Sequence, residues 1–430
     1  MVVPVLGSSA MAAGERTALH RRSDAARLEE AIGLARAIDL EIVHSGTVPL
    51  PSLRPATLMG QGKVDEIAGI VEAEEAGLVV IDHPLTPVQQ RNLEKAWKAK
   101  VLDRTGLILE IFGARAQTKE GRLQVELAHL QYQRGRLVRS WTHLERQRGG
   151  GGFLGGPGET QIEADRRQLQ ERVLKLERDL EKVRRTRSLH RSKRKKVPHP
   201  IVALVGYTNA GKSTLFNQLT GAGVMAKDML FATLDPTLRR LTLPGGTLVI
   251  LSDTVGFVSD LPTDLVAAFR ATLEEVIEAD LILHVRDMAD PDTAAQAEDV
   301  YAILDQLGIG EAGHANVREV WNKIDALDAQ QRDDLDARLL ASDGAPLAVS
   351  ALTGEGVPAL LAAIESDIAG EQTRFEIALP VDRLGELDWI YSHARVLDRD
   401  DREDGSVTLS LSGSAGVRET LETRLAGREG

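Results

Sequence analysis

The chain has 430 residues, of which 43% are apolar, 27% charged and 3% aromatic, and it carries a net charge of −12. This length suggests about two to four domains, and the proportions are typical of soluble globular proteins, which excludes the disordered and fibrous classes. The chain contains no cysteine, which excludes disulfides, thiolate metal sites and a cysteine nucleophile.

The charge is unevenly distributed along the chain. Between Arg115 and Lys196 there are 22 Lys or Arg against 10 Asp or Glu, so this segment carries +12 and the remainder −24. A basic segment within an acidic chain indicates a surface that binds a polyanion. The alternative is a solvated helical pair whose charges only keep it soluble.

The first 23 residues lack a basic region followed by an apolar core, so we expect no secretory signal. We expect residues 1–23 to form a flexible tail, with Met11 as an alternative start. No apolar run approaches the ~20 residues of a membrane span, so we expect a cytoplasmic protein without membrane insertion.

Residues 24–113 predict an N-terminal α/β domain with a small parallel sheet. The segments AARLEEAIGLARAI and GKVDEIAGIVEAEEAG have helical spacing, LEIVHSGTV and LVVID are strand patterns, and PVQQRNLEKAWKA begins a helix with Pro87. Strands that alternate with helices favour a parallel sheet. No phosphate-binding loop occurs in this segment, since GQGKVDE lacks the spacing.

Residues 114–196 predict a basic helical hairpin. The segments LQVELAHLQYQRGRLVRSWTHLERQ and RRQLQERVLKLERDLEKVRRTRSLHR read as two long helices that flank a glycine-rich loop from Gly149 to Glu159. The second helix has apolar residues three or four apart at Leu169, Val173, Leu176, Leu180 and Val183. We therefore expect an antiparallel pair with the glycine-rich loop at its tip, ended by the two prolines of VPHP.

Residues 201–370 again alternate strands with helices. The strand candidates are IVALVG, TLVILSD, DLILHVRD, REVWNK and PLAVSA. The segment LRRLTLPGGTLVILSD predicts a hairpin, so the sheet should be mostly parallel with one antiparallel edge strand. Residues 371–430 predict a small α+β domain.

A phosphate-binding loop follows the first strand of this region. GYTNAGKS fits the pattern G-x-x-x-x-G-K-[ST] and lies before a helical segment, with residues Gly206, Tyr207, Thr208, Asn209, Ala210, Gly211, Lys212 and Ser213. Backbone N–H groups of such a loop surround the β-phosphate, the lysine bridges the β- and γ-phosphates, and the serine hydroxyl binds Mg²⁺. Alone, the pattern predicts only a nucleoside triphosphate.

The segment NKID indicates which base is bound. It follows the strand pattern REVW and consists of Asn322, Lys323, Ile324 and Asp325, and a second strand pattern is followed by Ser350, Ala351 and Leu352. A carboxylate here can accept two N–H bonds from the guanine edge, whereas adenine would leave it unpaired. The alternative for an isolated NKID is a polar strand end that caps a helix. After a phosphate loop, we expect guanine specificity.

The segment DTVGF predicts the sensor of the γ-phosphate. It comprises Asp253, Thr254, Val255, Gly256 and Phe257. We expect the aspartate to face Mg²⁺ through a water and the Gly256 N–H to contact the γ-phosphate. In LFATLDPTL, Thr233 or Thr237 should give its hydroxyl to Mg²⁺ when that phosphate is present.

Taken together, these motifs make the chain resemble the HflX family of ribosome-associated GTPases over nearly its whole length. The resemblance lies in GYTNAGKSTLFN, FATLDPT, DTVGF, NKID and SAL, and also in EGRLQVELAHLQY, WTHLERQ and GPGETQIEADRR outside the GTPase core. It favours Thr233 as the second Mg²⁺ ligand and implies a first switch of Phe231, Ala232, Thr233, Leu234 and Asp235. Within the predicted site, we expect Lys212, Thr233 and Gly256 to take part in hydrolysis.

The resemblance also implies partners. It implies GTP-dependent binding to the RNA and proteins of the large ribosomal subunit and, in bacterial members, splitting of stalled or idle ribosomes. We expect the protein to be monomeric. Two alternatives stay open: a GTP-gated assembly or binding factor for the large subunit without splitting activity, and an RNA-remodelling ATPase that works through the N-terminal domain.

Phe257 occupies the position where many GTPases carry a glutamine that orients the attacking water, and its side chain forms no hydrogen bonds. The resemblance to GTPases with an apolar residue here suggests a Phe257 turned away from the γ-phosphate. We therefore predict slow hydrolysis by the isolated protein and stimulation by a partner that orders the switches. The alternative is that Phe257 simply packs in the core and that other residues suffice.

Overall fold

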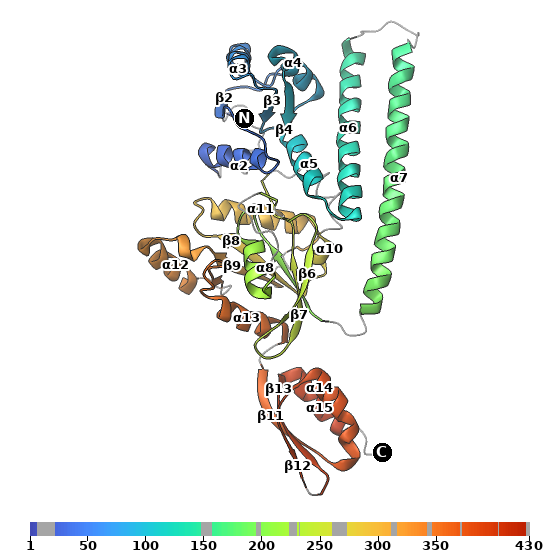
Figure 1. The fold of residues 1–430 in the computed structure, drawn as a ribbon, viewed down its shortest axis with the longest axis vertical. Coiled ribbons are helices and arrows are strands. Elements are labelled where there is room, and N and C mark those ends of the chain that lie inside the picture. Colours follow the sequence, from blue (N-terminus) through green and yellow to red (C-terminus); the bar gives the residue numbers. More distant parts are fainter. Residues whose placement is uncertain are drawn as a thin grey trace.

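The computed structural model describes residues 1–6, 22–147, 157–194, 199–222, 230–231, 233–259, 273–310, 316–341, 346–369, 372–402 and 404–426. The described chain forms an N-terminal α/β domain, a helical hairpin, a central α/β domain and a C-terminal α+β domain along one long axis (Figure 1). This arrangement confirms the fold class predicted from the sequence.

The N-terminal domain is a parallel sheet of order β2-β1-β3-β4 with helices α2 to α5. Its strands are β1 (Val2–Leu6), β2 (Gly46–Leu50), β3 (Leu78–Ile81) and β4 (Lys100–Asp103). Its helices are α2 (Asp24–Arg36), α3 (Gln61–Ala73), α4 (Pro87–Trp97) and α5 (Arg104–Arg115). Helix α4 begins at the expected proline, and a Thr86–Gln89 capping box fixes its start.

The expectation of a flexible tail is wrong for the first residues. Strand β1 pairs in parallel with all of β2, and Val3 is fully buried. The Met1 ammonium donates a hydrogen bond to the His44 carbonyl at 2.7 Å. The short run VVPVL is β-branched and apolar, which favours a buried strand, so a start at Met11 would remove a strand from inside the sheet. Residues 7–21 of the expected tail lie outside the described residues.

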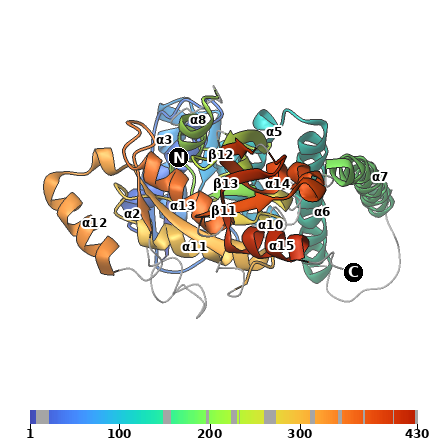
Figure 2. The same cartoon turned by 90° about the horizontal axis from the view of Figure 1, so that it is seen from below.

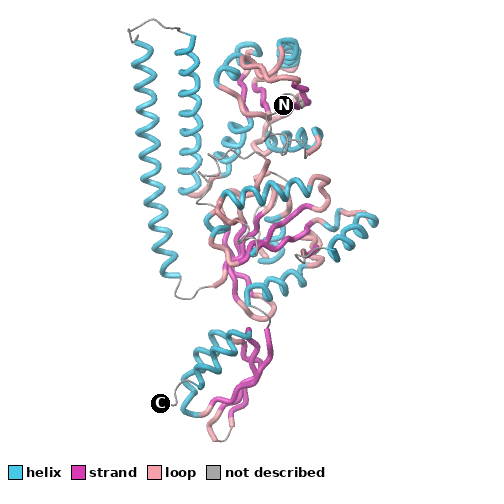
Figure 3. The backbone as a smooth tube through the Cα atoms, turned by 180° about the vertical axis from the view of Figure 1, so that it is seen from behind, coloured by secondary structure: helices cyan, strands magenta, loops and turns pink. Residues whose placement is uncertain are grey.

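Helices α6 (Lys119–Gln147) and α7 (Pro157–Arg194) form the long hairpin, which we call the arm. The two helices lie side by side (Figures 1 and 3). Leu127 and Leu130 of α6 pack on the α7 stripe of Val173, Leu176 and Leu180, so the predicted apolar stripe forms the seam. The predicted loop ends earlier than expected, because α7 begins at Pro157, a residue type suited to a first helical turn. Residues 148–156 lie outside the described part of the chain.

The central domain is a sheet of order β10-β9-β8-β5-β7-β6, in which only the β6–β7 pair is antiparallel. This confirms the predicted parallel sheet with one antiparallel edge strand. The strands are β5 (Ile201–Val205), β6 (Thr237–Thr242), β7 (Leu248–Asp253), β8 (Leu281–Asp287), β9 (Val317–Asn322) and β10 (Leu347–Ala348).

Helices cover both faces of this sheet. They are α8 (Lys212–Thr220), α10 (Glu274–Ile277), α11 (Thr293–Gln306), α12 (Ala329–Ala341) and α13 (Val357–Ala369), with a short 3-10 helix η2 (Ile324–Ala326). Along β5, Val202 and Leu204 face the core shared with α8 and α13, whereas Ala203 and Val205 face the core shared with α10 and α11. The two-residue period of a strand thus makes β5 apolar on both faces.

The core on the α11 side continues into the N-terminal domain. It includes Leu34 of α2, Phe112 of α5 and Val125 of α6 together with Phe231 and Phe257 of the central domain. Burying a side chain of this size contributes about 1.5–3 kcal/mol. The two domains therefore share one core, and the base of the arm is part of it.

The C-terminal domain is an antiparallel sheet of order β11-β13-β12 with its own apolar core. Its elements are β11 (Gln372–Leu379), η3 (Val381–Glu386), α14 (Leu387–His393), β12 (Arg395–Asp401), β13 (Val407–Ser414) and α15 (Ala415–Ala426). Its helices lie on one side of the strands (Figure 3). In Figure 2, α12 and the arm lie on opposite sides of the molecule. Among the described helices, none is long and apolar enough to cross a membrane.

Candidate nucleotide-binding site

The phosphate loop runs from the end of β5 to the start of α8, as predicted. Gly211 lies at the N-cap of α8, and Asn209 adopts a left-handed conformation at φ 62°. Ala210 is buried within the loop. Backbone N–H groups that converge at a helix N-terminus form an anion-binding site. The loop therefore has the geometry required to hold phosphates.

Lys212 is buried inside this loop. Its ammonium donates to the carbonyls of Gly206 at 3.0 Å and Tyr207 at 2.7 Å. Burial lowers the pKa of Lys212 to about 8, although the charge of Asp253 opposes that shift. A cation in such a site favours an anionic ligand.

Three oxygen-bearing side chains meet beside the loop. Ser213 Oγ donates to Asp253 Oδ2 at 2.7 Å, and Thr233 Oγ1 donates to the same oxygen at 2.9 Å. The two hydroxyls are 3.0 Å apart. Of the two threonines left open by spacing, Thr233 is therefore the one whose hydroxyl lies in this cluster.

The cluster fits a magnesium ion. Asp253 is fully buried, and its Oδ1 has no hydrogen-bond partner in the described structure. Burial raises the pKa of Asp253, and the hydrogen bond from Ser213 opposes that shift. A buried carboxylate with a spare oxygen beside two hydroxyls is a donor set of hard oxygen ligands, which Mg²⁺ prefers together with phosphate oxygens.

Gly256 lies directly against the phosphate loop. A Cβ at this position would lie 2.8 Å from Thr208 Cγ2 and 3.1 Å from the Lys212 ammonium. Only a glycine permits this approach. Its backbone is thus placed beside the lysine expected to bridge the phosphates. Next to it, Thr254 Oγ1 donates to the Leu204 carbonyl at 2.5 Å, and Val255 is buried in the core shared with α11.

Phe257 points into the core and not toward the phosphates. Its side chain is 1% exposed and packs in the core shared with the N-terminal domain. Its backbone extends the parallel pairing of β5 and β7, since Thr208 N donates to the Phe257 carbonyl at 2.7 Å and Phe257 N to the Gly206 carbonyl at 3.1 Å. Phe257 thus anchors the loop, and its ring takes no part in orienting water.

The predicted base-reading segments are brought together at the carboxyl ends of β9 and β10. Asn322 Nδ2 donates to the Ala210 carbonyl at 2.8 Å, and Ala351 N donates to Asn322 Oδ1 at 2.9 Å. Ser350 Oγ donates to Asp325 Oδ1 at 2.6 Å. The carboxylate proposed to read guanine is therefore oriented by a neighbouring hydroxyl.

The flanking residues of these segments have separate places. Lys323 is left-handed at φ 65° and pairs with Asp287 at 2.7 Å. Ile324 is buried, whereas Leu352 is 75% exposed. The side chain of Leu352 thus faces solvent, and its place in the site stays a prediction.

The expected first switch lies between the central domain and the N-terminal domain. The rings of Phe231 and Phe112 meet edge to face with centroids 4.8 Å apart. Leu234 is buried in the same core. Asp235 directs its carboxylate to the base of the arm, where Gln117 N donates to it at 2.9 Å. Ala232 lies outside the described residues.

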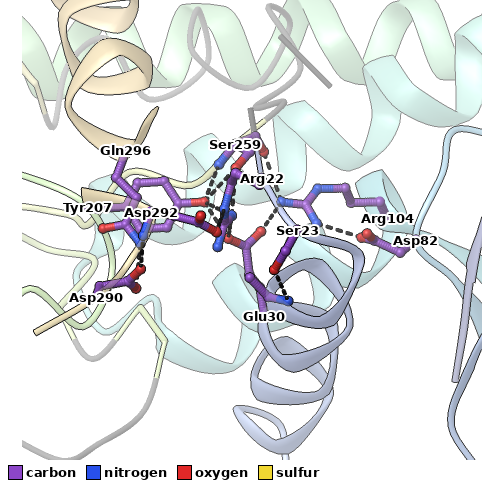
Figure 4. Close-up of polar contacts among 11 residues, drawn as sticks. Arg22, Ser23, Glu30, Asp82, Arg104, Tyr207, Ser259, Asp290, Asp292 and Gln296 are labelled. Carbon is purple, nitrogen blue, oxygen red and sulfur yellow. Dashed lines mark hydrogen bonds and ion pairs between the residues drawn. The ribbon is translucent and has the colours of Figure 1, made fainter. Parts of the chain in front are cut away.

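A buried polar network joins the phosphate loop to the N-terminal domain (Figure 4). The Tyr207 hydroxyl donates to Glu30 and accepts from Ser259 N at 2.9 Å. Glu30 forms salt bridges with Arg22 and with Arg104, the latter at 2.6 Å. We call these residues the Glu30 network.

Two further contacts extend the Glu30 network. Arg104 Nη2 donates to the Ser259 carbonyl at 2.9 Å, and Arg104 Nη1 pairs with Asp82 at 2.5 Å. Burial alone would raise the pKa of Glu30, but the charges of Arg104 and Arg22 outweigh it and hold that pKa below its ordinary value. Arg104 of the N-terminal domain therefore holds the backbone of Ser259, two residues after Phe257, through a charged hydrogen bond.

Sequence reasoning missed these interdomain contacts. Tyr207 is 177 residues from Glu30, and Asp235 is 117 residues from Thr118. No periodicity or local motif links such positions. The one usable signal was the aromatic residue inside the phosphate loop, because its tyrosine OH, when buried, requires a polar partner.

A cavity of about 410 Å³ lies elsewhere, within the N-terminal domain between β1, β2 and α3. Its lining includes Val2, Val48 and Ile67, and none of the nucleotide-site residues belongs to it. Despite its size, it is not where the predicted motifs converge. We therefore assign the site to the phosphate loop.

Four family models match the chain. They are described as GTP-binding GTPase N-terminal, over residues 25–113, and GTP-binding GTPase Middle Region, over 115–194. A model described as 50S ribosome-binding GTPase matches 201–323, and one described as HflX C-terminal domain matches 335–429.

Relatives match over most of the chain. The protein named GTPase HflX from Magnetococcus marinus is 52% identical over 88% of this chain and 86% of its own length. The GTPase HflX of Escherichia coli is 44% identical over 89% of each. Among solved structures, a complex of SsGBP with GDP is 24% identical, covers 85% of this chain and 98% of that one, and has a TM-score of 0.46.

Proposed function

Because the chain belongs to the HflX family of GTPases, we propose that its GTP form binds the large ribosomal subunit and splits stalled or idle ribosomes. The protein hydrolyses GTP, as its family membership and GTPase domain show. We propose that the ribosome stimulates this hydrolysis. Because its proposed partner is the ribosome, we propose that the protein is cytoplasmic. That it is monomeric stays a prediction.

The chemistry of the site is assigned residue by residue. The loop N–H groups and Lys212 would bind the β- and γ-phosphates, and Asp325 would select guanine. Ser213 and Thr233 would hold Mg²⁺ directly, with Asp253 acting through a water. The ion would supply charge that offsets the phosphate oxygens during hydrolysis. The Gly256 N–H, beside Lys212, is the backbone group that would contact the γ-phosphate.

The burial of Phe257 fits both hydrolysis that depends on a partner and the alternative in which other residues place the water. With its ring in the core, no side chain of the segment Asp253–Phe257 takes the place of a water-orienting glutamine. We propose that backbone groups place the water and that their position depends on how well the switches are held. A partner that orders the switches would raise the rate, by about 10³ to 10⁵ when the missing groups come in trans.

The arm is the observation that carries the ribosome proposal. It is a long basic hairpin that runs beside the N-terminal domain and, along α7, beside the central domain (Figure 1). A segment of charge +12 on such a projection is suited to nucleic-acid phosphates. We propose ribosomal RNA as its target, with the segment 148–156 between its helices entering an RNA-lined space.

Sedimentation of intact ribosomes tests the proposal. After incubation with the protein and GTP, ribosomes should separate into subunits, and Lys212→Ala should prevent this. If the protein sediments with large subunits while ribosomes stay joined, it is a binding or assembly factor. ATP turnover that survives Lys212→Ala would instead support an ATPase in the N-terminal domain. Ribosomes that stay joined in the presence of the protein and GTP would refute splitting.

A further inference from the structure

The first switch is held on both sides of Thr233 by residues outside the central domain. On one side, Phe231 is 2% exposed and packs on Phe112 of α5. On the other side, the Asp235 carboxylate binds the segment that leads into α6. Thr233 lies between these two attachments, with its hydroxyl 2.9 Å from Asp253 Oδ2.

Asp235 completes the start of the arm. Its Oδ2 accepts from Gln117 N and from Thr118 N, both at 2.9 Å, and its Oδ1 accepts from Thr118 Oγ1 at 2.5 Å. Thr118 Oγ1 in turn accepts from Gly121 N at 2.9 Å, within the first turn of α6. Helix N-termini carry unpaired N–H groups and positive potential, so a carboxylate there is stabilising. Both oxygens of Asp235 are thus hydrogen-bonded to the two residues that lead into the arm.

The close approach depends on Gly121. A Cβ built on this residue would lie 2.6 Å from Asp235 Oδ1 and 3.1 Å from Thr118 Oγ1. Any larger residue would push the carboxylate away from the helix. The first turn of α6 is therefore shaped to accept Asp235.

We propose that Asp235 is a positioning residue for GTP hydrolysis: by capping the arm helix it fixes Thr233 at the magnesium cluster, so the nucleotide site and the arm are coupled through this contact. The proposal rests on the magnesium role given to Thr233 under the proposed function. Coupling between two sites is reciprocal. Mg²⁺ and GTP bound at the cluster would hold Thr233 in place and so strengthen the attachment of the arm, and an arm held by RNA would strengthen the Thr233 position.

Thr118 offers a matched test, because it does not belong to the nucleotide site. Thr118→Ala removes the hydroxyl that donates to Asp235 and also caps Gly121 N. Thr86→Ala is the control, since Thr86 Oγ1 caps α4 through Gln89 N at 3.2 Å, in the N-terminal domain. Thr118→Ser keeps the hydroxyl and should restore the wild-type behaviour.

Gly121→Ala provides a second test that does not weaken the helix. Alanine raises helix propensity by up to about 1 kcal/mol over glycine, while its Cβ displaces the Asp235 carboxylate. Gly69→Ala in α3 is the control, since a Cβ there meets nothing within 4 Å. A defect in Gly121→Ala alone would therefore arise from the lost contact and not from unfolding.

The readout is the affinity for a non-hydrolysable fluorescent GTP analogue and for GDP during a Mg²⁺ titration. Thr118→Ala and Gly121→Ala should weaken Mg²⁺-supported binding of the GTP analogue by about 5-fold or more, the lower end of typical site coupling. GDP affinity should not change, because Thr233 acts only when the γ-phosphate is present. Both controls and Thr118→Ser should match the wild type.

Two results would overturn the inference: unchanged affinity in both test variants, or equal weakening of GDP and the GTP analogue. Cosedimentation with large ribosomal subunits gives the reciprocal readout. The ratio of subunit affinity with the GTP analogue bound to that with GDP bound should fall toward one in both test variants. If the wild type does not bind subunits at all, the proposed function fails, and the Mg²⁺ titration still decides the coupling.

Discussion

Replacing Glu30 by glutamine should destabilise the joint between the N-terminal and central domains. Glu30 receives Arg22, Arg104 and the Tyr207 hydroxyl, and the side chains of both arginines and of the glutamate are 10% exposed or less. Removing one partner of a buried ion pair costs about 3–5 kcal/mol. Arg104 keeps its second carboxylate, Asp82, so we expect about 3 kcal/mol, the lower end of that range.

Urea denaturation followed by circular dichroism measures the loss in free energy of unfolding from the shift in the midpoint urea concentration between wild type and Glu30→Gln. Glu29→Gln is the matched control, because Glu29 is an exposed carboxylate on the same helix. The pKa of Glu30 is lowered in the folded protein, so its stabilisation is complete above the ordinary carboxyl pKa and is lost as the pH falls through the lowered value. The difference between wild type and Glu30→Gln should therefore shrink at acid pH. A loss below about 1 kcal/mol, the scale of an exposed pair, would refute the reasoning.

Three further predictions concern single side chains. Asp325→Asn should lower GTP affinity at least ~100-fold and favour xanthosine triphosphate, because the 2-carbonyl of xanthine can accept a hydrogen bond from the new amide. Competition binding with both nucleotides checks this, and retained GTP affinity would contradict it. Burial lowers the pKa of His284 to about 3, so stability should fall with decreasing pH below 6.5, by about 2 kcal/mol near pH 5; His284→Leu should remove this loss in urea titrations, and an identical pH profile would count against it. Gln124 is fully buried and its amide has no partner in the described structure, so Gln124→Met should raise the free energy of unfolding by about 1 kcal/mol; a destabilised variant would show that the amide has a role.

Local motifs predicted the nucleotide site because its chemistry is concentrated in short segments. The loop Gly206–Ser213 needs only a strand before it and a helix after it, and both were recognisable from apolar patterns. The sequence could place Asn322–Asp325 at the same sheet edge because parallel strands direct their carboxyl ends there. It could not choose between Thr233 and Thr237, since the path of the chain before β6 depends on residues of another domain; in the structure Thr233 lies in that irregular connection, whereas Thr237 begins β6.

The interdomain contacts could not be predicted for a related reason. Asp235 reads as part of a switch, and only the folded chain shows that its carboxylate binds Thr118 at the base of the arm. The first strand differs from the expected tail because Val2–Leu6 is only five residues long and becomes a strand by pairing with β2, more than forty residues away. From the sequence, Phe257 is an apolar residue at the position where many GTPases have a glutamine. The structure shows that its ring packs in the core shared with the N-terminal domain.

Turnover measured with and without purified large ribosomal subunits, over a salt series, tests the central claim most directly. The free protein should hydrolyse GTP slowly, subunits should raise the rate by about 10³ or more, and added salt should abolish the gain as the arm loses its phosphate contacts. A free protein that already turns over at ~10 s⁻¹, a typical enzyme rate, and does not respond to subunits would contradict the account.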